Sequence, residues 1–229
     1  MALPIILWIV AGVVSMLGGT ALSVYWNDII VALKGKRIAV LGARGVGKTH
    51  LIKFLTSGSI PSEYKQTLAP EKAAAKRLQL KDLDLKIKDT LDLSGDKAAY
   101  AEWKELHNKS DLVFYLLRAD GLMAGDVAVE SRVREDLRHI GGWLKGLKDK
   151  SAARPRFFII GTHCDLDNEF AAFADRLGDY ADKFQTLPIV SELVAHGGGS
   201  KETKVILGSM KTVQDTEALV YKIFMQVKP

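Results

Sequence analysis

Residues 42–49 read GARGVGKT, and this stretch decides the fold of the chain. It is a complete G-x-x-x-x-G-K-[ST] phosphate-binding loop. The letters RIAVLG at residues 37–42 predict an apolar strand before it, and residues 48–57 predict a helix after it, as the motif requires. Glycines let backbone N–H groups turn inward around phosphates, and the helix N-terminus adds the positive end of its dipole. The residues expected to line this phosphate site are Gly42, Arg44, Gly45, Val46, Gly47, Lys48 and Thr49.

Two side chains of this loop have specific expected roles. Lys48 should reach the β- and γ-phosphates of a nucleoside triphosphate, and the Thr49 hydroxyl should ligate Mg²⁺. The loop alone fits ATPases and nucleotide kinases as well as GTPases, so the identity of the base must come from the rest of the chain.

Strands and helices alternate after the loop. Helices are expected at residues 48–57, 98–108, 127–150, 169–184 and 215–227, and strands at residues 37–42, 76–81, 85–91, 112–117, 156–161 and 204–207. Continuous apolar strands separated by helices indicate a mostly parallel sheet covered on both faces. The sequence therefore predicts an α/β fold of the phosphate-loop NTPase class, built on a six-stranded sheet.

The N-terminus predicts a membrane anchor. Residues 1–27 carry no charged side chain, and residues 3–26 read LPIILWIVAGVVSMLGGTALSVYW. As a helix this run spans about 36 Å, enough to cross a hydrocarbon core of about 30 Å. A cleaved signal peptide fits less well, because no cation precedes the run and the run is too long. We divide the chain into a transmembrane anchor (1–26), a connector (27–35) and one globular domain (36–229).

Charge sets the expected topology and partners. The first cations, Lys34, Lys36 and Arg37, follow the apolar run, so the positive-inside rule places the domain in the cytoplasm and the N-terminus outside or in a lumen. The 229 residues carry 32 Lys and Arg against 27 Asp and Glu, a net charge of +5. These charges are interleaved, without a basic run that includes aromatics, so we expect no nucleic-acid partner. The lone Cys164 excludes an internal disulfide.

Four further motifs follow the loop in order. They are PSEYKQT at residues 61–67, DLSG at 92–95, GTHCDL at 161–166 and SMK at 209–211. With the loop, this series resembles the Ras superfamily of small GTPases. The first and third motifs look Rho-like, and the spacing from Asp92 to Trp103 looks Arf-like. An N-terminal membrane helix before such a domain is similar in architecture to the signal recognition particle receptor β subunit, although architecture does not establish function.

A guanine site is expected at the third and fourth motifs. Asp165 follows a buried strand, and its carboxylate would accept from both N1–H and the 2-amino group of guanine, a donor pair that adenine lacks. The resemblance adds Thr162 and His163 to this site, together with Ser209, the Met210 amide and a stacking Lys211. Residues 108–111, NKSD, match the family motif by letter, but they precede a strand, whereas ligands bind at strand carboxyl ends.

The resemblance also implies the metal and catalytic groups. Thr67 and Asp92 would hold Mg²⁺ together with Thr49, Asp92 acting through water, and the Thr67 and Gly95 amides would meet the γ-phosphate. Asp96 stands where many members carry a water-orienting glutamine. A carboxylate there cannot donate a hydrogen bond and repels phosphate, so hydrolysis of GTP by Lys48, Thr67, Gly95 and Asp96 should be slow without a partner.

Three functions remain open from the sequence. The first is a GTP/GDP switch with bound Mg²⁺ that recruits or regulates an unidentified protein effector at the membrane. The second is a nucleotide-dependent docking platform with negligible turnover. The third, an ATPase or nucleotide kinase, rests on the phosphate loop alone and is disfavoured by Asp165 and the SMK motif.

Overall fold

The computed structural model describes residues 36–57, 77–79, 84–86, 100–148, 154–173 and 177–227. The expected membrane helix, the PSEYKQT motif at residues 61–67 and the DLSG motif lie outside these ranges. Among the helices within them, none combines the length and apolar character needed to span a membrane.

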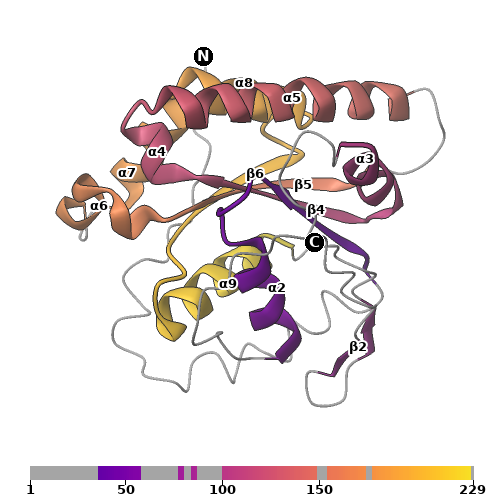
Figure 1. Ribbon diagram of the computed structural model, residues 1–229, viewed down its shortest axis with the longest axis horizontal. Coiled ribbons are helices and arrows are strands. Elements are labelled where there is room, and N and C mark those ends of the chain that lie inside the picture. Colours follow the sequence, from indigo (N-terminus) through magenta and orange to yellow (C-terminus); the bar gives the residue numbers. More distant parts are fainter. Residues whose placement is uncertain are drawn as a thin grey trace.

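A parallel four-stranded sheet forms the centre of the fold (Figure 1). Its strands are β1 (Ile38–Gly42), β4 (Leu112–Arg118), β5 (Arg156–Thr162) and β6 (Thr203–Leu207), in the spatial order β1-β4-β5-β6. Strands β2 (Arg77–Gln79) and β3 (Asp84–Lys86) pair antiparallel as a separate unit. The parallel α/β sheet is confirmed, whereas a single six-stranded sheet is not: the described residues form one sheet of four strands and one of two.

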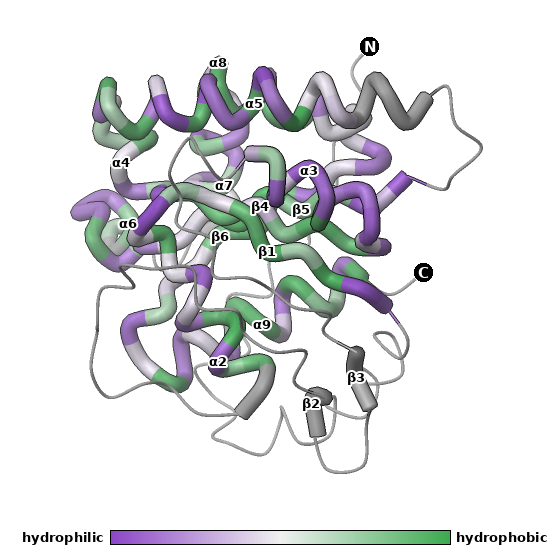
Figure 2. The backbone as a smooth tube through the Cα atoms, turned by 45° about the vertical axis from the view of Figure 1, so that its right-hand side comes forward, coloured by the Kyte–Doolittle hydropathy of each residue, from purple (hydrophilic) through white to green (hydrophobic). Residues whose placement is uncertain are grey.

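Helices cover both faces of this sheet (Figure 1). Helices α2 (Lys48–Ser57) and α9 (Val213–Val227) pack on one face, and α3 (Tyr100–Lys109), α5 (Val127–Lys148), α7 (Leu177–Thr186) and α8 (Pro188–His196) on the other. The strands alternate between these layers, because Ala39 and Leu41 join the α5 side while Ile38 and Val40 join the α2 side. Figure 2 shows the resulting apolar centre.

Four elements differ from the sequence prediction. The helix expected at residues 169–184 is two helices, α6 (Asn168–Ala172) and α7. Helix α4 (Ala119–Met123), the 3₁₀ turn η2 (Cys164–Leu166) and α8 were not anticipated. A one-turn helix is too short to show apolar periodicity, which explains α4 and η2. Helix α8 carries a start signal that was overlooked, a proline in its first turn.

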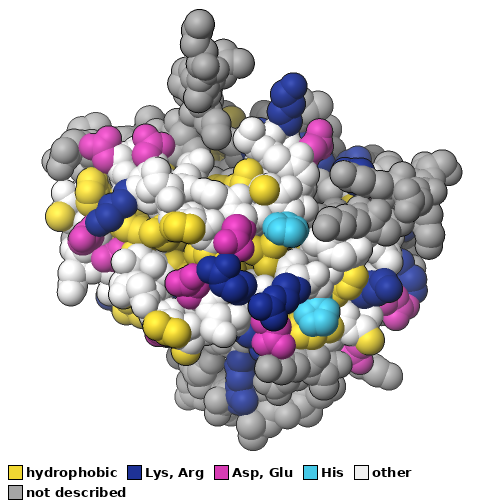
Figure 3. Space-filling view, turned by 90° about the horizontal axis from the view of Figure 1, so that it is seen from above, with side chains coloured by type: hydrophobic (Ala, Val, Ile, Leu, Met, Phe, Trp, Pro, Cys, Tyr) yellow, Lys and Arg dark blue, Asp and Glu magenta, His cyan; other side chains and the backbone are white. Residues whose placement is uncertain are grey.

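Charged side chains are mixed on the outer surface of the α5–α8 layer. Figure 3 views this side from above and shows acidic and basic groups interspersed. Arg134 of α5 donates to Glu130 of the same helix at 2.7 Å and to Glu192 of α8 at 2.9 Å. This exposed network links the two outer helices, and exposed pairs of this kind contribute little to stability.

A buried carboxylate joins three elements beneath the same layer. The Asp136 side chain of α5 is fully buried and accepts hydrogen bonds from the hydroxyls of Tyr100 at 2.5 Å and Tyr115 at 2.8 Å. Its third donor is the Arg132 Nε, at 2.9 Å. The guanidinium of Arg132 also lies over the Tyr100 ring, 5.7 Å from the ring centroid. Asp136 therefore fastens the start of α3 and the middle of β4 to α5.

This cluster gives a stability prediction. Replacing Asp136 with Ala leaves the Arg132 guanidinium, which is 20% exposed, without its carboxylate and two tyrosine hydroxyls unpaired, so the free energy of unfolding should fall by about 3–5 kcal/mol. Glu130→Ala removes an exposed carboxylate from the same helix and should cost under about 1 kcal/mol. Urea unfolding of the chain in detergent measures both values. A loss below about 1 kcal/mol for Asp136→Ala would show that the cluster does not hold α3 in place.

Candidate functional site

The phosphate loop begins where β1 touches its neighbour. Gly42 ends β1 with φ +142°, and a Cβ at this position would lie 2.3 Å from the Leu116 carbonyl oxygen of β4. Gly47 has φ +91°, and a Cβ there would lie 2.2 Å from the Met210 Cε. Gly42 therefore requires glycine for both backbone conformation and space, whereas Gly47 requires it for its positive φ, because the end of the Met210 side chain can move. Because Gly42 and Gly47 have no Cβ, the loop lies close to β4 and to the segment that follows β6.

Lys48 and Thr49 open α2 directly beneath this loop. The Lys48 side chain is buried, and its ammonium donates to the Ala43 carbonyl oxygen at 2.9 Å, so it curls back over the loop. The helix continues with a bond from the Leu51 amide to the Gly47 carbonyl oxygen at 2.9 Å. The helix N-terminus thus directs its amides and positive dipole end toward the loop, an arrangement that suits an anion. Arg44, at the outer turn of the loop, is exposed.

Thr162 connects the loop to the end of β5. Its hydroxyl oxygen is fully buried and lies 3.0 Å from the Val46 carbonyl oxygen and 3.0 Å from the Leu117 carbonyl oxygen. The His163 Nδ1 is the third neighbour, at 2.8 Å. One side chain therefore joins the phosphate loop, β4 and β5. The sequence assigned Thr162 to the guanine motif, and the structure shows that it also braces the phosphate loop.

Asp165 is held in place by the segment after β6. The Ser209 hydroxyl donates to Asp165 Oδ1 at 2.6 Å, and the Lys211 amide donates to the Ser209 oxygen at 3.0 Å. Backbone bonds from the Cys164 amide to the Gly208 carbonyl and from the Gly208 amide to the Gly161 carbonyl tie the two segments together. The two motifs therefore form one unit, in which a fixed carboxylate is available to accept from paired donors.

Three other residues of these two motifs are Met210, Cys164 and Lys211. The first two side chains are buried and the third is exposed. Met210 is buried against Gly47, while the Lys211 side chain is exposed and free to cover a planar ligand. Cys164 is buried, and burial raises the pKa of its thiol to about 12, so it stays protonated at neutral pH. Its role is packing.

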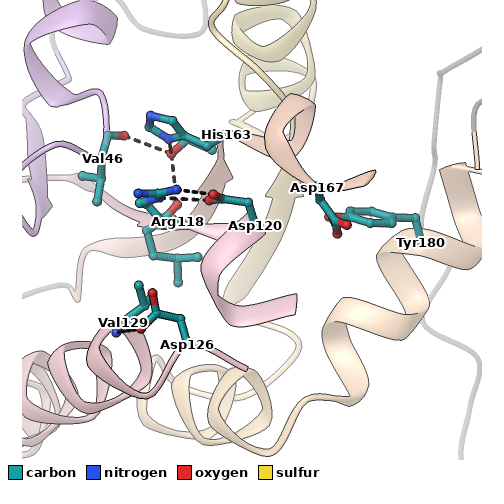
Figure 4. Close-up of polar contacts among 10 residues, drawn as sticks. Val46, Arg118, Asp120, Asp126, Val129, His163, Asp167 and Tyr180 are labelled. Carbon is teal, nitrogen blue, oxygen red and sulfur yellow. Dashed lines mark hydrogen bonds and ion pairs between the residues drawn. The ribbon is translucent and has the colours of Figure 1, made fainter. Parts of the chain in front are cut away.

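Two charged residues at this edge were missed by sequence reasoning. Arg118, the last residue of β4, donates from Nε to Asp120 Oδ1 at 3.0 Å and from Nη2 to Asp120 Oδ2. Figure 4 shows this pair beside His163 and Val46. The available signal was their position directly after the buried strand LVFYLL, because ligands in parallel sheets bind at strand carboxyl ends.

His163 has an unusual backbone and electrostatic setting. Its φ of +60° is the one positive value at a non-glycine residue in the described part of the chain. Left-handed backbone is enriched at His but still carries strain, which clusters at functional sites. Burial lowers the pKa of His163, and the nearby Arg118 lowers it further. The imidazole is therefore neutral at neutral pH.

The structure gathers most of the predicted site at one edge of the sheet. The phosphate loop, the Thr162–Asp165 turn and the Ser209–Lys211 segment follow β1, β5 and β6 at their carboxyl ends. Asp111, from the NKSD motif, instead lies at the amino end of β4 and receives the Arg37 backbone amide at 2.7 Å. Thr67, Asp92, Gly95 and Asp96 lie outside the described residues.

These groups fit a guanine nucleotide. The loop offers glycine backbone without Cβ atoms at the phosphate end, and Asp165 offers a fixed carboxylate at the base end. Within the described residues, no group of three or more His, Cys, Asp or Glu side chains is arranged for a metal ion. A single protein hydroxyl, such as that of Thr49, together with phosphate oxygens and water is the donor set that Mg²⁺ uses at nucleotide sites.

Comparisons with known proteins identify the family. The family model described as "Ras family" matches residues 37–191. Among curated proteins, none matches the chain significantly. One similar solved structure is the Arl6 (BBS3) small GTPase of Trypanosoma brucei with the bound nucleotide analogue GppNp, with a TM-score of 0.46 and 11% identity; the match covers 84% of this chain and 99% of that one. Another is an ADP-ribosylation-factor-like protein of Encephalitozoon cuniculi, the small COPII coat GTPase Sar1, in complex with GDP, with a TM-score of 0.48 and 15% identity; the match covers 89% of this chain and 88% of that one. Both likenesses are too distant to carry an argument. On the family match, the chain belongs to the Ras family of small GTPases, which bind GTP and GDP, normally with Mg²⁺, and hydrolyse GTP.

Proposed function

We propose that this chain is a membrane-anchored GTP/GDP switch with slow intrinsic hydrolysis, which recruits or regulates a protein partner at the membrane. The observation that carries the nucleotide part is the Asp165–Ser209 pair, joined to the phosphate loop through the Thr162 hydroxyl. This arrangement supports simultaneous binding of a base and its phosphates by one rigid edge of the sheet. The base and phosphate contacts then reinforce each other.

Base selection follows from the chemistry of Asp165. Guanine presents N1–H and a 2-amino group on one edge, and an ionised carboxylate accepts both bonds. The Ser209 hydroxyl occupies one side of Oδ1 and fixes the orientation of the carboxylate, and each carboxylate oxygen retains further acceptor capacity. Adenine would offer that carboxylate no matching pair of donors, and leaving a charge under-paired in a partly buried site is costly. The site therefore favours guanine over adenine.

Phosphate binding and hydrolysis depend on both ends of the loop. The Lys48 ammonium, now on the Ala43 carbonyl, is positioned to reach incoming phosphate oxygens. When bound, Mg²⁺ supplies neutralisation of the β- and γ-phosphate charge. Thr49 is the residue of the described site that would ligate it, with Thr67 and Asp92 completing the set. Asp96 lacks the donor that a water-orienting glutamine has, which supports slow turnover in the isolated chain.

The anchor rests on residues 3–26, an uncharged run bounded by Tyr25 and Trp26 at one end. Aromatic side chains of this kind favour the headgroup region of a bilayer. The cations that follow it, Lys34, Lys36 and Arg37, favour a cytoplasmic domain with the short N-terminus outside or in a lumen. An effector would then meet the nucleotide site close to the membrane surface.

A docking platform with negligible turnover is the alternative, and Asp96 is the feature that favours it. The two readings differ in how long GTP persists on the protein. A switch requires that a partner or exchange factor alters the nucleotide within its working time. A platform retains GTP through many rounds of partner binding, so comparison of turnover with dwell time separates them.

The base assignment predicts the effect of Asp165→Asn. The substitution replaces a charged acceptor and presents a donor to guanine N1–H, so GDP affinity should fall by about 2–3 kcal/mol. Asp167→Asn is a matched control in the same turn, because Asp167 accepts from Tyr180 and the Glu169 amide rather than facing the base segment. Titration with GDP and ADP measures both. Equal affinity of the unaltered chain for GDP and ADP would contradict the guanine assignment.

The anchor predicts membrane extraction behaviour and sidedness. The full chain should remain with membranes in carbonate at high pH and enter solution in detergent, whereas a chain that starts at Lys36 should be released without detergent. Protease added outside intact cells should leave the domain undigested. Digestion of the domain from outside would overturn the proposed topology.

The rate prediction concerns Asp96. The purified chain should hydrolyse GTP in single-turnover assays at or below about 5 × 10⁻⁴ per second, the rate of Ras without an activator. Asp96→Gln should speed this rate or leave it unchanged, since glutamine restores a donor to the attacking water. A rate of about one per second that disappears in Asp96→Gln would make Asp96 a catalytic base and refute slow intrinsic hydrolysis.

A further inference from the structure

The four parallel strands begin together at the edge of the sheet opposite the nucleotide motifs. Strand pairing places Ile38 beside Leu112, Leu112 beside Arg156, and Phe157 beside Thr203, so β1, β4, β5 and β6 start within one residue of a common line. Neighbouring strands lie about 4.8 Å apart, so this line is about 15 Å long. In Figure 1 the strands begin on the side of α3 and run toward α4 and α6. We call the strand starts and the three residues before each of them the amino edge.

An exposed cation precedes every strand at the amino edge. Lys36 and Arg37 precede β1, Lys109 precedes β4, Arg154 precedes β5 and Lys201 precedes β6, each within three residues of the strand start. These five residues come from four separate segments of the chain. Because the strands start on a common line, the fold gathers at one edge a group of cations that no run of the sequence shows.

Acids are fewer at this edge. Within the same three-residue segments they are Asp111 and Glu202. The Asp111 carboxylate binds the Arg37 guanidinium, with 3.1 Å between Arg37 Nη2 and Asp111 Oδ1. A further acid, Glu105 of α3, forms an ion pair with Lys109. Five exposed cations therefore stand with three acids, and the described part of the amino edge is positively charged.

The nucleotide edge has a different charge over matching segments. The three residues after the end of each strand include one cation, Arg44, and two acids, Asp120 and Asp165. A bound guanine nucleotide would add the negative charge of its phosphates at this edge. The two ends of the sheet therefore differ in sign, and an anionic surface would attract the amino edge and repel the nucleotide edge.

The proposed anchor joins the domain at the amino edge. The connector, residues 27–35, leads from the apolar run to Lys36, directly before β1. The Arg37 amide donates to the Asp111 carboxylate at 2.7 Å, which fixes the entering chain beside the start of β4. Nine connector residues span at most about 32 Å when fully extended. The amino edge is therefore the end of the sheet that the anchor would hold nearest the bilayer.

We propose that the amino edge is a membrane-docking surface that binds the anionic lipid headgroups of the leaflet from which the anchor emerges. The inference rests on the proposed anchor and does not depend on which nucleotide the chain binds. The negative potential of such a leaflet attracts cations within a Debye length of about 8–10 Å. The anchor keeps the edge at a high effective concentration near the lipid, so a few cations are enough to bias its orientation.

Docking in this orientation directs the nucleotide edge away from the bilayer. The strands have five to seven residues, so they carry the phosphate loop and the Thr162–Asp165 turn about 16–23 Å farther from the lipid than the amino edge. A protein partner would then reach the nucleotide site without competing with the headgroups.

Site-specific labels on the full chain in vesicles test the orientation. Cys164 is the one cysteine of the sequence and is buried, so a cysteine introduced at an exposed position takes a fluorescent label selectively. Ser200→Cys places the label at the amino edge, and Gln214→Cys places it in the first turn of α9, beyond β6. Quenching by a lipid with a nitroxide headgroup reports proximity to the membrane. With phosphatidylserine present, the label at residue 200 should be quenched more strongly than the label at residue 214.

The lipid and the salt concentration control this difference. Quenching at residue 200 should fall in vesicles of phosphatidylcholine alone, and it should fall at high salt in vesicles that contain phosphatidylserine. The label at residue 214 should respond little to either change, because it lies at the opposite end of the sheet. Equal quenching at residue 200 with and without phosphatidylserine, or stronger quenching at residue 214, would overturn the inference.

A pair of substitutions tests the cations themselves. Arg154→Gln with Lys201→Gln removes two charges from the amino edge and leaves Lys36 and Arg37, which set the expected topology, in place. Each cation near an anionic surface favours binding about fivefold, so the ratio of docked to undocked chain should fall about 25-fold. Quenching at residue 200 should then approach its value in phosphatidylcholine alone, while GDP binding in detergent should stay unchanged.

The matched control removes two exposed cations from the outer surface of α5, through Arg134→Gln with Arg138→Gln. It should leave quenching at residue 200 unchanged, and an equal loss in this control would show that net charge alone matters and would overturn the inference. If the amino-edge variant fails to fold, the lipid and salt dependence of the otherwise unaltered chain still decides. Release of the chain by carbonate would refute the proposed anchor and the inference together, whereas a retained chain without lipid-dependent quenching would refute the inference alone.

Discussion

The nucleotide edge of this molecule depends on the hydroxyl of Thr162. Three parallel strand ends meet there, and the hydroxyl lies between the Val46 carbonyl of the phosphate loop and the Leu117 carbonyl of β4. The backbone amides of a phosphate loop must point inward toward the phosphates. The loop keeps this conformation only where surrounding groups constrain it. The close approach of Gly42 to Leu116 supplies the first constraint, and Thr162 supplies the second. The phosphate end and the base end therefore cannot move independently, and a ligand that spans both would stabilise the whole edge.

Three charged groups at this edge have defined partners. The Lys48 ammonium lies on a backbone carbonyl, Asp165 accepts from Ser209, and Arg118 is held by Asp120. An unpaired charge at a partly buried site is costly, so each of these pairs also fixes a side-chain position. The lysine can exchange its carbonyl for phosphate, and Asp165 has acceptor capacity left for the base. The Arg118–Asp120 pair is different, since its two charged groups bind each other through two nitrogens and two oxygens.

The sequence predicted the parts of this structure that depend on local pattern. The apolar runs at β1, β4, β5 and β6 and the helix that begins at Lys48 needed only periodicity and the loop motif. Family membership followed from the order of motifs and is confirmed by the family match. The short helices α6 and α4 were not predictable, because a helix of about one turn is too short to show apolar periodicity. Likewise, Arg118 and Thr162 lie far apart in the chain but face each other in the sheet register, so their relationship required the fold.

The central claim is that one ligand, a guanine nucleotide, contacts the ends of β1, β5 and β6 together. Amide hydrogen exchange on the full chain in detergent with Mg²⁺ tests this claim most directly, because bound ligand slows exchange wherever it orders the backbone. Addition of GDP should protect residues 44–49, 162–166 and 208–211 together, and ADP at the same concentration should protect them far less. Protection of residues 44–49 alone, or equal protection by GDP and ADP, would contradict a joined guanine site and leave only a phosphate-binding loop.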